Sequence, residues 1–269
     1  MKIGLNVGYA RTKAVSDGRQ TVFESVSGTP DRGAFSLHGG NGRLELVEPT
    51  HVLVGAEAVK QSRFLSRPEG RDWVGGDTWL ALARIAMTEL TPASIQGQIV
   101  SGLPIAFYQE QDIKRMKNAL LGEHNLKRAG HDRQTIEITS VRVIPEPFGT
   151  VLDAAMNGSG KVVDGAIATG RIGVIDLGGK TTNVLSVDRL GDVGKETASI
   201  NQGAWDIVRA FRTWLESHYP DADLRDHELT ERSAAQQHSC DLCEMVGHPK
   251  PAAADSTGEE FTFEKLTEK

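Results

Sequence analysis

The chain has 269 residues, of which 39% are hydrophobic and 25% charged, and its mean hydropathy is −0.31. This composition is typical of a soluble globular protein with one large or two smaller domains. A net charge of −6 argues against broad electrostatic binding to nucleic acid. Apolar runs stay below the roughly 18 residues that span a bilayer, and only two cysteines are present, so we expect a cytoplasmic protein without membrane contact.

The first fifteen residues predict a strand, a tight turn and a second strand. Ile3, Leu5 and Val7 alternate with smaller or polar residues, which is the period of a strand in a sheet. A polar residue, Asn6, lies near the end of the first strand. The turn and the start of the second strand combine glycine, hydroxyl and cationic residues, namely Gly8, Tyr9, Ala10, Arg11, Thr12 and Lys13.

The next hundred residues predict further strands and two helices. Asp77 is the predicted N-cap of the first helix, and Gly122 follows the end of the second. Residues 27–42 are rich in turn formers and predict a surface loop. The patterns indicate strands over 20–26, 43–49, 51–59 and 97–104, and helices over 75–90 and 110–122.

A proline-flanked glutamate follows the next predicted strand, which covers residues 135–144. Pro145 and Pro147 break the strand, and residues 148–156 continue as a helix. Glu146 between them is a carboxylate at a strand–helix junction, where it could orient a water molecule. The alternative is an acidic residue in the first helical turn, which the helix dipole favours.

Residues 171–188 predict a second hairpin of the same layout. Asp176 ends its first strand, and the turn contains Gly178, Gly179, Lys180, Thr181 and Thr182. Backbone amides freed by glycine, two hydroxyls and one carboxylate suit a phosphate with its divalent cation. An ordinary hairpin is the alternative. The first hairpin has the same order of features, so the two indicate an internal duplication.

The last part of the chain changes in character. Residues 157–170 are glycine-rich and form the best candidate domain boundary, and residues 203–220 predict an amphipathic helix. From about residue 233 the periodicity fades, which predicts a poorly ordered tail. Cys240 and Cys243, flanked by His238 and His248, could bind zinc, but a single CxxC pair favours no structural metal.

Taken together, these stretches resemble the actin, sugar-kinase and heat-shock-chaperone ATPase superfamily. Within it, the chain resembles most the actin-like proteins of the plasmid-segregation (ParM/StbA) class. The resemblance covers about residues 1–231 and rests on six segments in family order: IGLNVGYARTKAV, VLVGAEA, IVSGLP, VIPEPFGTVLDA, VIDLGGKTTNV and SINQGAWDIVRAF. It implies an α/β, actin-like (ribonuclease H-like) fold, a duplicated mixed sheet with flanking helices and an incomplete second half. Domain I would span 1–160, a partial domain II 171–232 and the tail 233–269.

The resemblance also implies a nucleotide site. In the family, two hairpins clamp the β- and γ-phosphates of ATP with Mg²⁺ in a cleft between two domains. The residues already named in the two hairpins match the two phosphate loops. Glu146 matches the acid that positions the attacking water, and Asp176 matches the one that holds hydrated Mg²⁺. Members form filaments that move plasmid DNA through an adaptor protein, so no direct contact with nucleic acid is expected.

Two departures from the family pattern affect these expectations. Asn6 replaces the usual aspartate, which removes a charge beside Mg²⁺ and predicts slow turnover. The expected glycine-rich adenosine-binding segment is not visible after the second hairpin. We therefore expect either a truncated or frame-shifted gene product, or a tail that replaces this region.

Two further functions fit the same residues. A metabolite kinase of the superfamily would need a catalytic aspartate near a sugar site, and no motif for one stands out. A binding module that has lost hydrolysis would agree with Asn6 and with the short second half.

Overall fold

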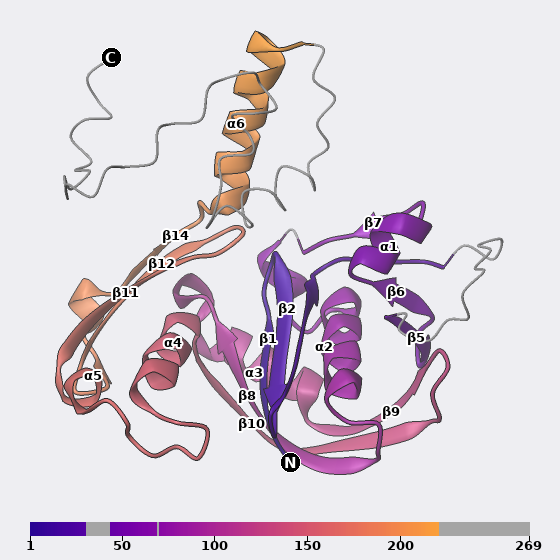
Figure 1. Ribbon diagram of the computed structural model, residues 1–269, viewed down its shortest axis with the longest axis horizontal. Coiled ribbons are helices and arrows are strands. Elements are labelled where there is room, and N and C mark those ends of the chain that lie inside the picture. Colours follow the sequence, from indigo (N-terminus) through magenta and orange to yellow (C-terminus); the bar gives the residue numbers. More distant parts are fainter. Residues whose placement is uncertain (31–43, 69, 221–269) are drawn as a thin grey trace, which may run out of the picture. The chain divides into compact units, whose positions relative to one another are not determined.

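The computed structural model describes residues 1–30, 44–68 and 70–220 (Figure 1). The chain forms two compact units, Met1–Ala204 and Trp205–Lys269. Most of the predicted loop at 27–42, the predicted tail at 233–269 and the motif of Cys240 and Cys243 lie outside the described residues. The predicted boundary at 157–170 stays a prediction.

The first unit contains a ten-stranded mixed sheet. Its central strands are β1 (Lys2–Val7), β8 (Ile95–Leu103) and β10 (Gln134–Pro145), which run parallel to one another. Seven further strands pair antiparallel: β2 (Arg11–Ser16), β3 (Arg19–Glu24), β4 (Ser27–Gly28), β5 (Glu45–Glu48), β6 (Val52–Val54), β7 (Leu65–Ser66) and β9 (Gly122–Arg128). The order across the sheet is β3-β2-β1-β8-β10-β9-β5-β6-β4-β7. The carboxyl ends of β1 and β10 therefore lie on either side of the end of β8.

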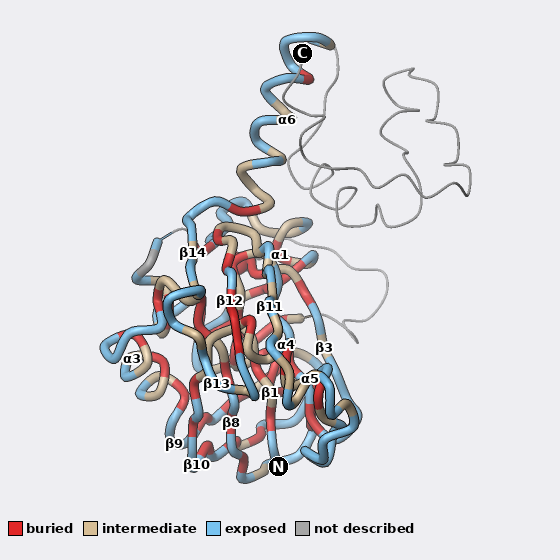
Figure 2. Tube along the Cα trace, turned by 90° about the vertical axis from the view of Figure 1, so that its left-hand side faces the viewer, coloured by how far each residue is buried: buried red, intermediate tan, exposed pale blue. Residues whose placement is uncertain are grey.

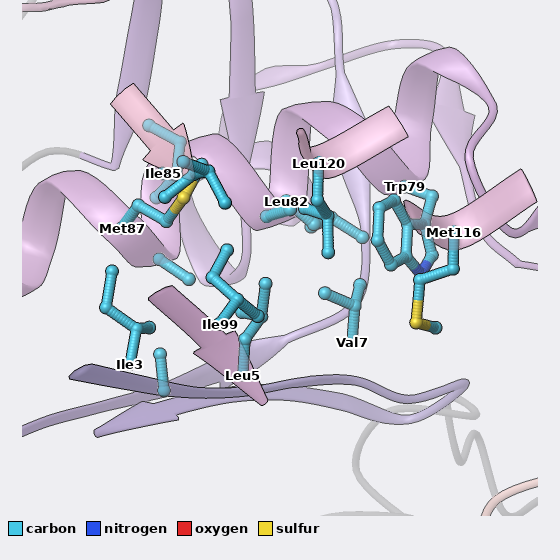
Figure 3. Close-up of a cluster of buried hydrophobic side chains, with 14 of the residues drawn as sticks. Ile3, Leu5, Val7, Trp79, Leu82, Ile85, Met87, Ile99, Met116 and Leu120 are labelled. Atoms are coloured by element: carbon cyan, nitrogen blue, oxygen red, sulfur yellow. The ribbon is translucent and has the colours of Figure 1, made fainter. Parts of the chain in front are cut away.

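Two helices cover one face of the central strands with a continuous apolar core (Figure 3). Helix α2 (Asp77–Leu90) contributes Trp79, Leu82 and Met87, which are fully buried, and α3 (Glu110–Leu120) adds its own apolar side chains. They face the buried side of β1, whose inward residues alternate as predicted. The apolar residues of a strand recur with period 2 and lie on one face of the sheet, and those of a helix recur with period 3.6 and form a stripe along one side. Packing the helix stripe against the sheet face buries both.

Two sequence predictions in this unit need correction. Residues 51–59 were expected to form one strand, but β6 ends at Val54 and helix α1 (Ala56–Gln61) follows. Gly55 has a φ of 64°, a left-handed conformation that turns the chain between the two elements. Asp77 is the first residue of α2 and makes no capping hydrogen bond, because Gly76 occupies the N-cap position.

A smaller antiparallel sheet carries the second hairpin. It consists of β11 (Arg171–Leu177), β12 (Thr182–Asp188), β13 (Gly191–Asp192) and β14 (Ala198–Ile200). Leu185 and Val187 of β12 pack against Val151 of α4 (Glu146–Ala155) in a second apolar cluster. Figure 2 shows the buried residues gathered along β12. Helix α4 thus joins the end of β10 to the second hairpin.

The remaining elements are short, apart from one helix in the second unit. Helix α5 (Gly165–Thr169) has Asp164 as its N-cap. The first unit also contains three short 3₁₀ helices, which are η1 (Arg71–Trp73), η2 (Ile105–Phe107) and η3 (Gly194–Glu196). Helix α6 (Ala204–His218) has the predicted amphipathic pattern. Among residues 1–30, 44–68 and 70–220, no helix has the length and apolar character needed to cross a membrane.

The core assignment predicts the effect of Leu82→Ala. Leu82 is completely buried, so we expect the substitution to lower the free energy of unfolding by about 2–5 kcal/mol through lost burial and a residual cavity. Val22 of β3 is 54% exposed, and Val22→Ala is the control, with an expected cost below about 1 kcal/mol. Urea unfolding of the full chain measures both. Equal costs at the two positions would contradict this core.

Candidate functional site

The two predicted hairpins share one backbone geometry. In the first, Asn6 pairs with Lys13, and the Gly8 amide donates to the Arg11 carbonyl at 3.1 Å. In the second, Asp176 pairs with Asn183, and the Gly178 amide donates to the Thr181 carbonyl at 2.9 Å. Each turn therefore contains four residues between the last strand pairs and closes with the same hydrogen bond. The predicted duplication extends to the register of the strands.

The first position of both turns is crowded, and a glycine occupies it in each. A Cβ atom on Gly8 would lie 3.2 Å from the Arg11 carbonyl oxygen, and one on Gly178 would lie 3.1 Å from the Thr181 oxygen. A third glycine, Gly203, approaches the second turn so closely that a Cβ atom would lie 2.6 Å from the carbonyl oxygens of residues 178 and 179. Sequence reasoning did not assign a role to Gly203, because its neighbour in space is 24 residues away.

The tips of the two turns lie next to each other. The Lys180 ammonium of the second turn lies 5.4 Å from the centroid of the Tyr9 ring in the first. Tyr9 is buried, its hydroxyl donates to the Gly70 carbonyl at 3.1 Å, and its ring lies 5.3 Å from that of Trp73. A cation from one turn thus rests on an aromatic face fixed in the other, a favourable arrangement.

The two hydroxyls at the starts of the second strands support the turns themselves. The Thr12 hydroxyl is completely buried and lies 2.9 Å from the Ser25 hydroxyl. The Thr182 hydroxyl donates to the Gln202 carbonyl at 2.7 Å. Thr181 is buried, whereas Arg11 and Lys13 are exposed. The role of all these residues as ligand contacts stays a prediction.

Glu146 is the first residue of α4, directly after the end of β10. Strand β8 lies beside it, and a Cβ atom on Gly102 would lie 2.8 Å from the Glu146 Cγ atom and 3.2 Å from its Cα atom. Only glycine leaves room for this carboxylate in its present place. Gly102 is therefore a second supporting residue that the sequence did not identify, because its role depends on the pairing of β8 with β10.

The electrostatics of Glu146 show that both hairpins converge on it. Burial, the largest effect, and the charge of Asp176 raise the pKa of the Glu146 carboxyl from 4.5 to about 7. The charge of Lys13 and a hydrogen bond with the Asn6 side chain act in the opposite direction. The residue as a whole keeps some solvent exposure, but protein atoms around its carboxyl dominate the shift. Asn6, Lys13, Glu146 and Asp176 thus form one cluster.

This cluster fits a hydrated magnesium ion. The Asn6 Oδ1 atom is buried and has no hydrogen-bond partner in the described part of the chain, so a free oxygen acceptor is present. Asp176 adds a carboxylate from the second hairpin. Mg²⁺ prefers oxygen ligands and usually takes one or two carboxylates with water and phosphate. No group of three His, Cys, Asp or Glu residues placed to hold a metal ion directly occurs among the described residues.

Residues 4–149 match the model of the N-terminal domain of actin-like proteins. The chain belongs to the actin-like protein family. This confirms the predicted actin-like α/β fold and the resemblance to the ParM class. No curated protein sequence matches the chain significantly.

Several solved structures share the fold. Apo psk41 ParM has a TM-score of 0.64 and 19% identity, over 91% of this chain and 78% of that chain. An archaeal actin homologue in complex with ADP has a TM-score of 0.66 and 19% identity, over 86% and 70%. The Alp12 filament structure has a TM-score of 0.57 and 15% identity, over 78% and 63%. At such identities the likeness shows the fold alone.

The raised pKa of Glu146 predicts a pH-dependent stability. The folded chain binds this proton more tightly than the unfolded chain does, so the contribution of Glu146 to stability falls as pH rises from about 4.5 to about 7. We expect Glu146→Gln to remove this loss and to be more stable than the wild type at pH 8, by roughly 3 kcal/mol at most, with little difference at pH 4.5. Urea unfolding at both pH values measures the effect.

The matched control is Glu137→Gln, at an exposed glutamate of β10. It should follow the wild type at both pH values. An identical pH dependence in wild type and Glu146→Gln would show that the carboxyl of Glu146 is not desolvated.

Proposed function

We propose that this actin-like protein binds Mg²⁺·ATP between its two glycine turns and assembles into filaments in a nucleotide-dependent manner. The observation that carries the proposal is the convergence of two equivalent turns, with Asn6, Glu146 and Asp176 together at their bases. The proposed setting is plasmid or DNA segregation, or a bacterial or archaeal cytoskeleton. The proposed domains are residues 1–160 and 171–232.

Each residue of the cluster would have a different role in phosphoryl transfer. The backbone of the two turns would hold the β- and γ-phosphates, and Arg11, Lys13 and Lys180 would offset their charge. Asp176 and Asn6 would hold hydrated Mg²⁺, which neutralises negative charge on the phosphates when bound.

Glu146 would take the proton of the attacking water. A general base acts best when its pKa lies near the working pH, and the pKa of Glu146 near 7 meets this condition. Lys13 and Asn6 favour its ionised form, because both lower that pKa.

Self-assembly and cargo are proposed from the relatives. One relative was solved as a filament and another in complex with ADP. An acidic chain with a net charge of −6 is poorly suited to direct DNA binding, so an adaptor protein would connect the filament to DNA. A second candidate function is a binding module with little or no hydrolysis, which the uncharged Asn6 favours.

Nucleotide-dependent light scattering and pelleting of the full chain test the proposed function. We expect assembly with Mg²⁺·ATP and disassembly as phosphate is released. Glu146→Gln should still bind ATP but release phosphate about 10²–10⁴-fold more slowly, because it lacks the base. Glu137→Gln should behave as the wild type. If the wild type shows no ATP binding at millimolar concentration, the proposal is wrong.

Asn6→Asp tests the effect of the missing charge. A carboxylate at this position restores a negative oxygen beside Asp176 and Glu146, so Mg²⁺ should be held more firmly and phosphate release should be faster. Single-turnover phosphate release at saturating Mg²⁺ measures the change. An unchanged rate would show that Asn6 does not limit turnover, and a rate too low to detect in both proteins would favour the binding module.

A further inference from the structure

Asn183 is a buried amide at the base of the second turn. It lies in β12 opposite Asp176 and has no exposed surface. Its Nδ2 atom donates to the Asp176 Oδ2 atom at 3.2 Å. Its Oδ1 atom accepts two hydrogen bonds, from the Ile105 backbone amide at 3.1 Å and from the Ser199 hydroxyl at 2.8 Å. A single side chain therefore connects three separate segments.

Two of these segments, η2 and β14, lie close in the chain to glycines that contact Glu146 or the second turn. Ile105 begins η2, which follows β8 after one residue, and β8 carries the glycine that faces Glu146. Ser199 lies in β14, four residues before Gly203, which contacts the second turn. Through Asn183, the carboxylate of Asp176 is therefore tied to the end of a central strand of the first sheet.

The type of side chain matters as much as its position. An amide offers a donor and a two-fold acceptor on one short planar group that stays uncharged at neutral pH, whereas a carboxyl group does so only when protonated. In the first hairpin another amide faces a carboxylate, since the Asn6 side chain forms a hydrogen bond with Glu146. Two neutral amides thus hold two carboxylates that repel each other, and they add no charge to a cluster that already contains Lys13.

We propose that Asn183 is the positioning residue of the nucleotide site, which fixes the Asp176 carboxylate and couples the second turn to η2 and β8. This inference rests on the proposed function for its consequence in nucleotide binding. Its structural part, the hold of the Asn183 amide on Asp176, stands independently of any nucleotide. If Asp176 moved, its carboxylate would no longer be correctly oriented toward Glu146 and toward the bound Mg²⁺.

The Asn183→Asp variant tests the donor function of the Asn183 side chain separately from its acceptor function. A protonated carboxyl is close in shape to the amide: its hydroxyl can donate to Asp176 while its carbonyl oxygen accepts from Ile105 and Ser199. Once ionised, it still accepts but no longer donates, and it repels Asp176 and Glu146. Lys13 of β2 is the cation that interacts with this cluster. In stability and in Mg²⁺·ATP binding, the variant should therefore resemble the wild type at low pH and fall below it at high pH.

The first measurement is the melting temperature of the nucleotide-free full chain at pH 5 and pH 8. Relative to wild type at the same pH, we expect Asn183→Asp to melt roughly 5 °C lower or more at pH 8 and to lie close to wild type at pH 5. Asn183→Ala should lose stability at both pH values. Ser199→Ala, which keeps the bond to Asp176, should show a smaller loss that does not change with pH.

The second measurement is the dissociation constant of Mg²⁺·ATP at the same two pH values. We expect Asn183→Asp to bind at least ten-fold more weakly than wild type at pH 8, with recovery at pH 5. A loss in Asn183→Asp that is equal at both pH values, or no loss at all, would reduce Asn183 to a packing residue and overturn the proposal. Absence of ATP binding in the wild type would instead refute the proposed function, while the nucleotide-free melting curves would still decide the role of Asn183.

Discussion

The site depends on the repulsion between two carboxylates that the fold holds close together. Glu146 enters from the first helical turn after β10, and Asp176 enters from the end of β11. Such groups tend to separate or to take up a proton, and burial together with the charge of Asp176 raises the pKa of Glu146 accordingly. What keeps them in place is a set of neutral donors, close glycine contacts and one nearby ammonium group. A magnesium–nucleotide complex is the kind of ligand that such a cluster suits, because the cation offsets the carboxylates.

The parallel pairing of β1, β8 and β10 provides the frame for this cluster. Because parallel strands end at the same edge of a sheet, Asn6 and Glu146 come together although 140 positions separate them. Gly102 at the end of β8 leaves room for the Glu146 side chain. Helix α4 then runs from this edge to the second sheet, so the same element that begins with Glu146 also supports the second hairpin. One helix thus both positions Glu146 and packs against the second hairpin.

The sequence allowed much of this arrangement to be predicted, for identifiable reasons. Strands β1 and β2, helix α3 and the hairpin of residues 171–188 have strong periodicity and clear turn residues, and their predicted positions agree with the structure to within a few residues. The prediction for residues 51–59 was wrong because an alternating apolar pattern continued past Gly55, where the backbone changes direction. Local pattern alone does not show where a strand gives way to a helix when both would bury the same residues.

By itself, the sequence determined the family, the two turns and the two carboxylates, because these features depend on local residue order. Only the tertiary structure decided which groups support them. Gly102, Asn183 and Gly203 lie in segments that the sequence singled out, but the local order of residues does not reveal their roles, since each acts on a segment that reaches it through sheet pairing or loop packing. The raised pKa of Glu146 has the same origin, because burial and the approach of Asp176 exist only once the two hairpins have met.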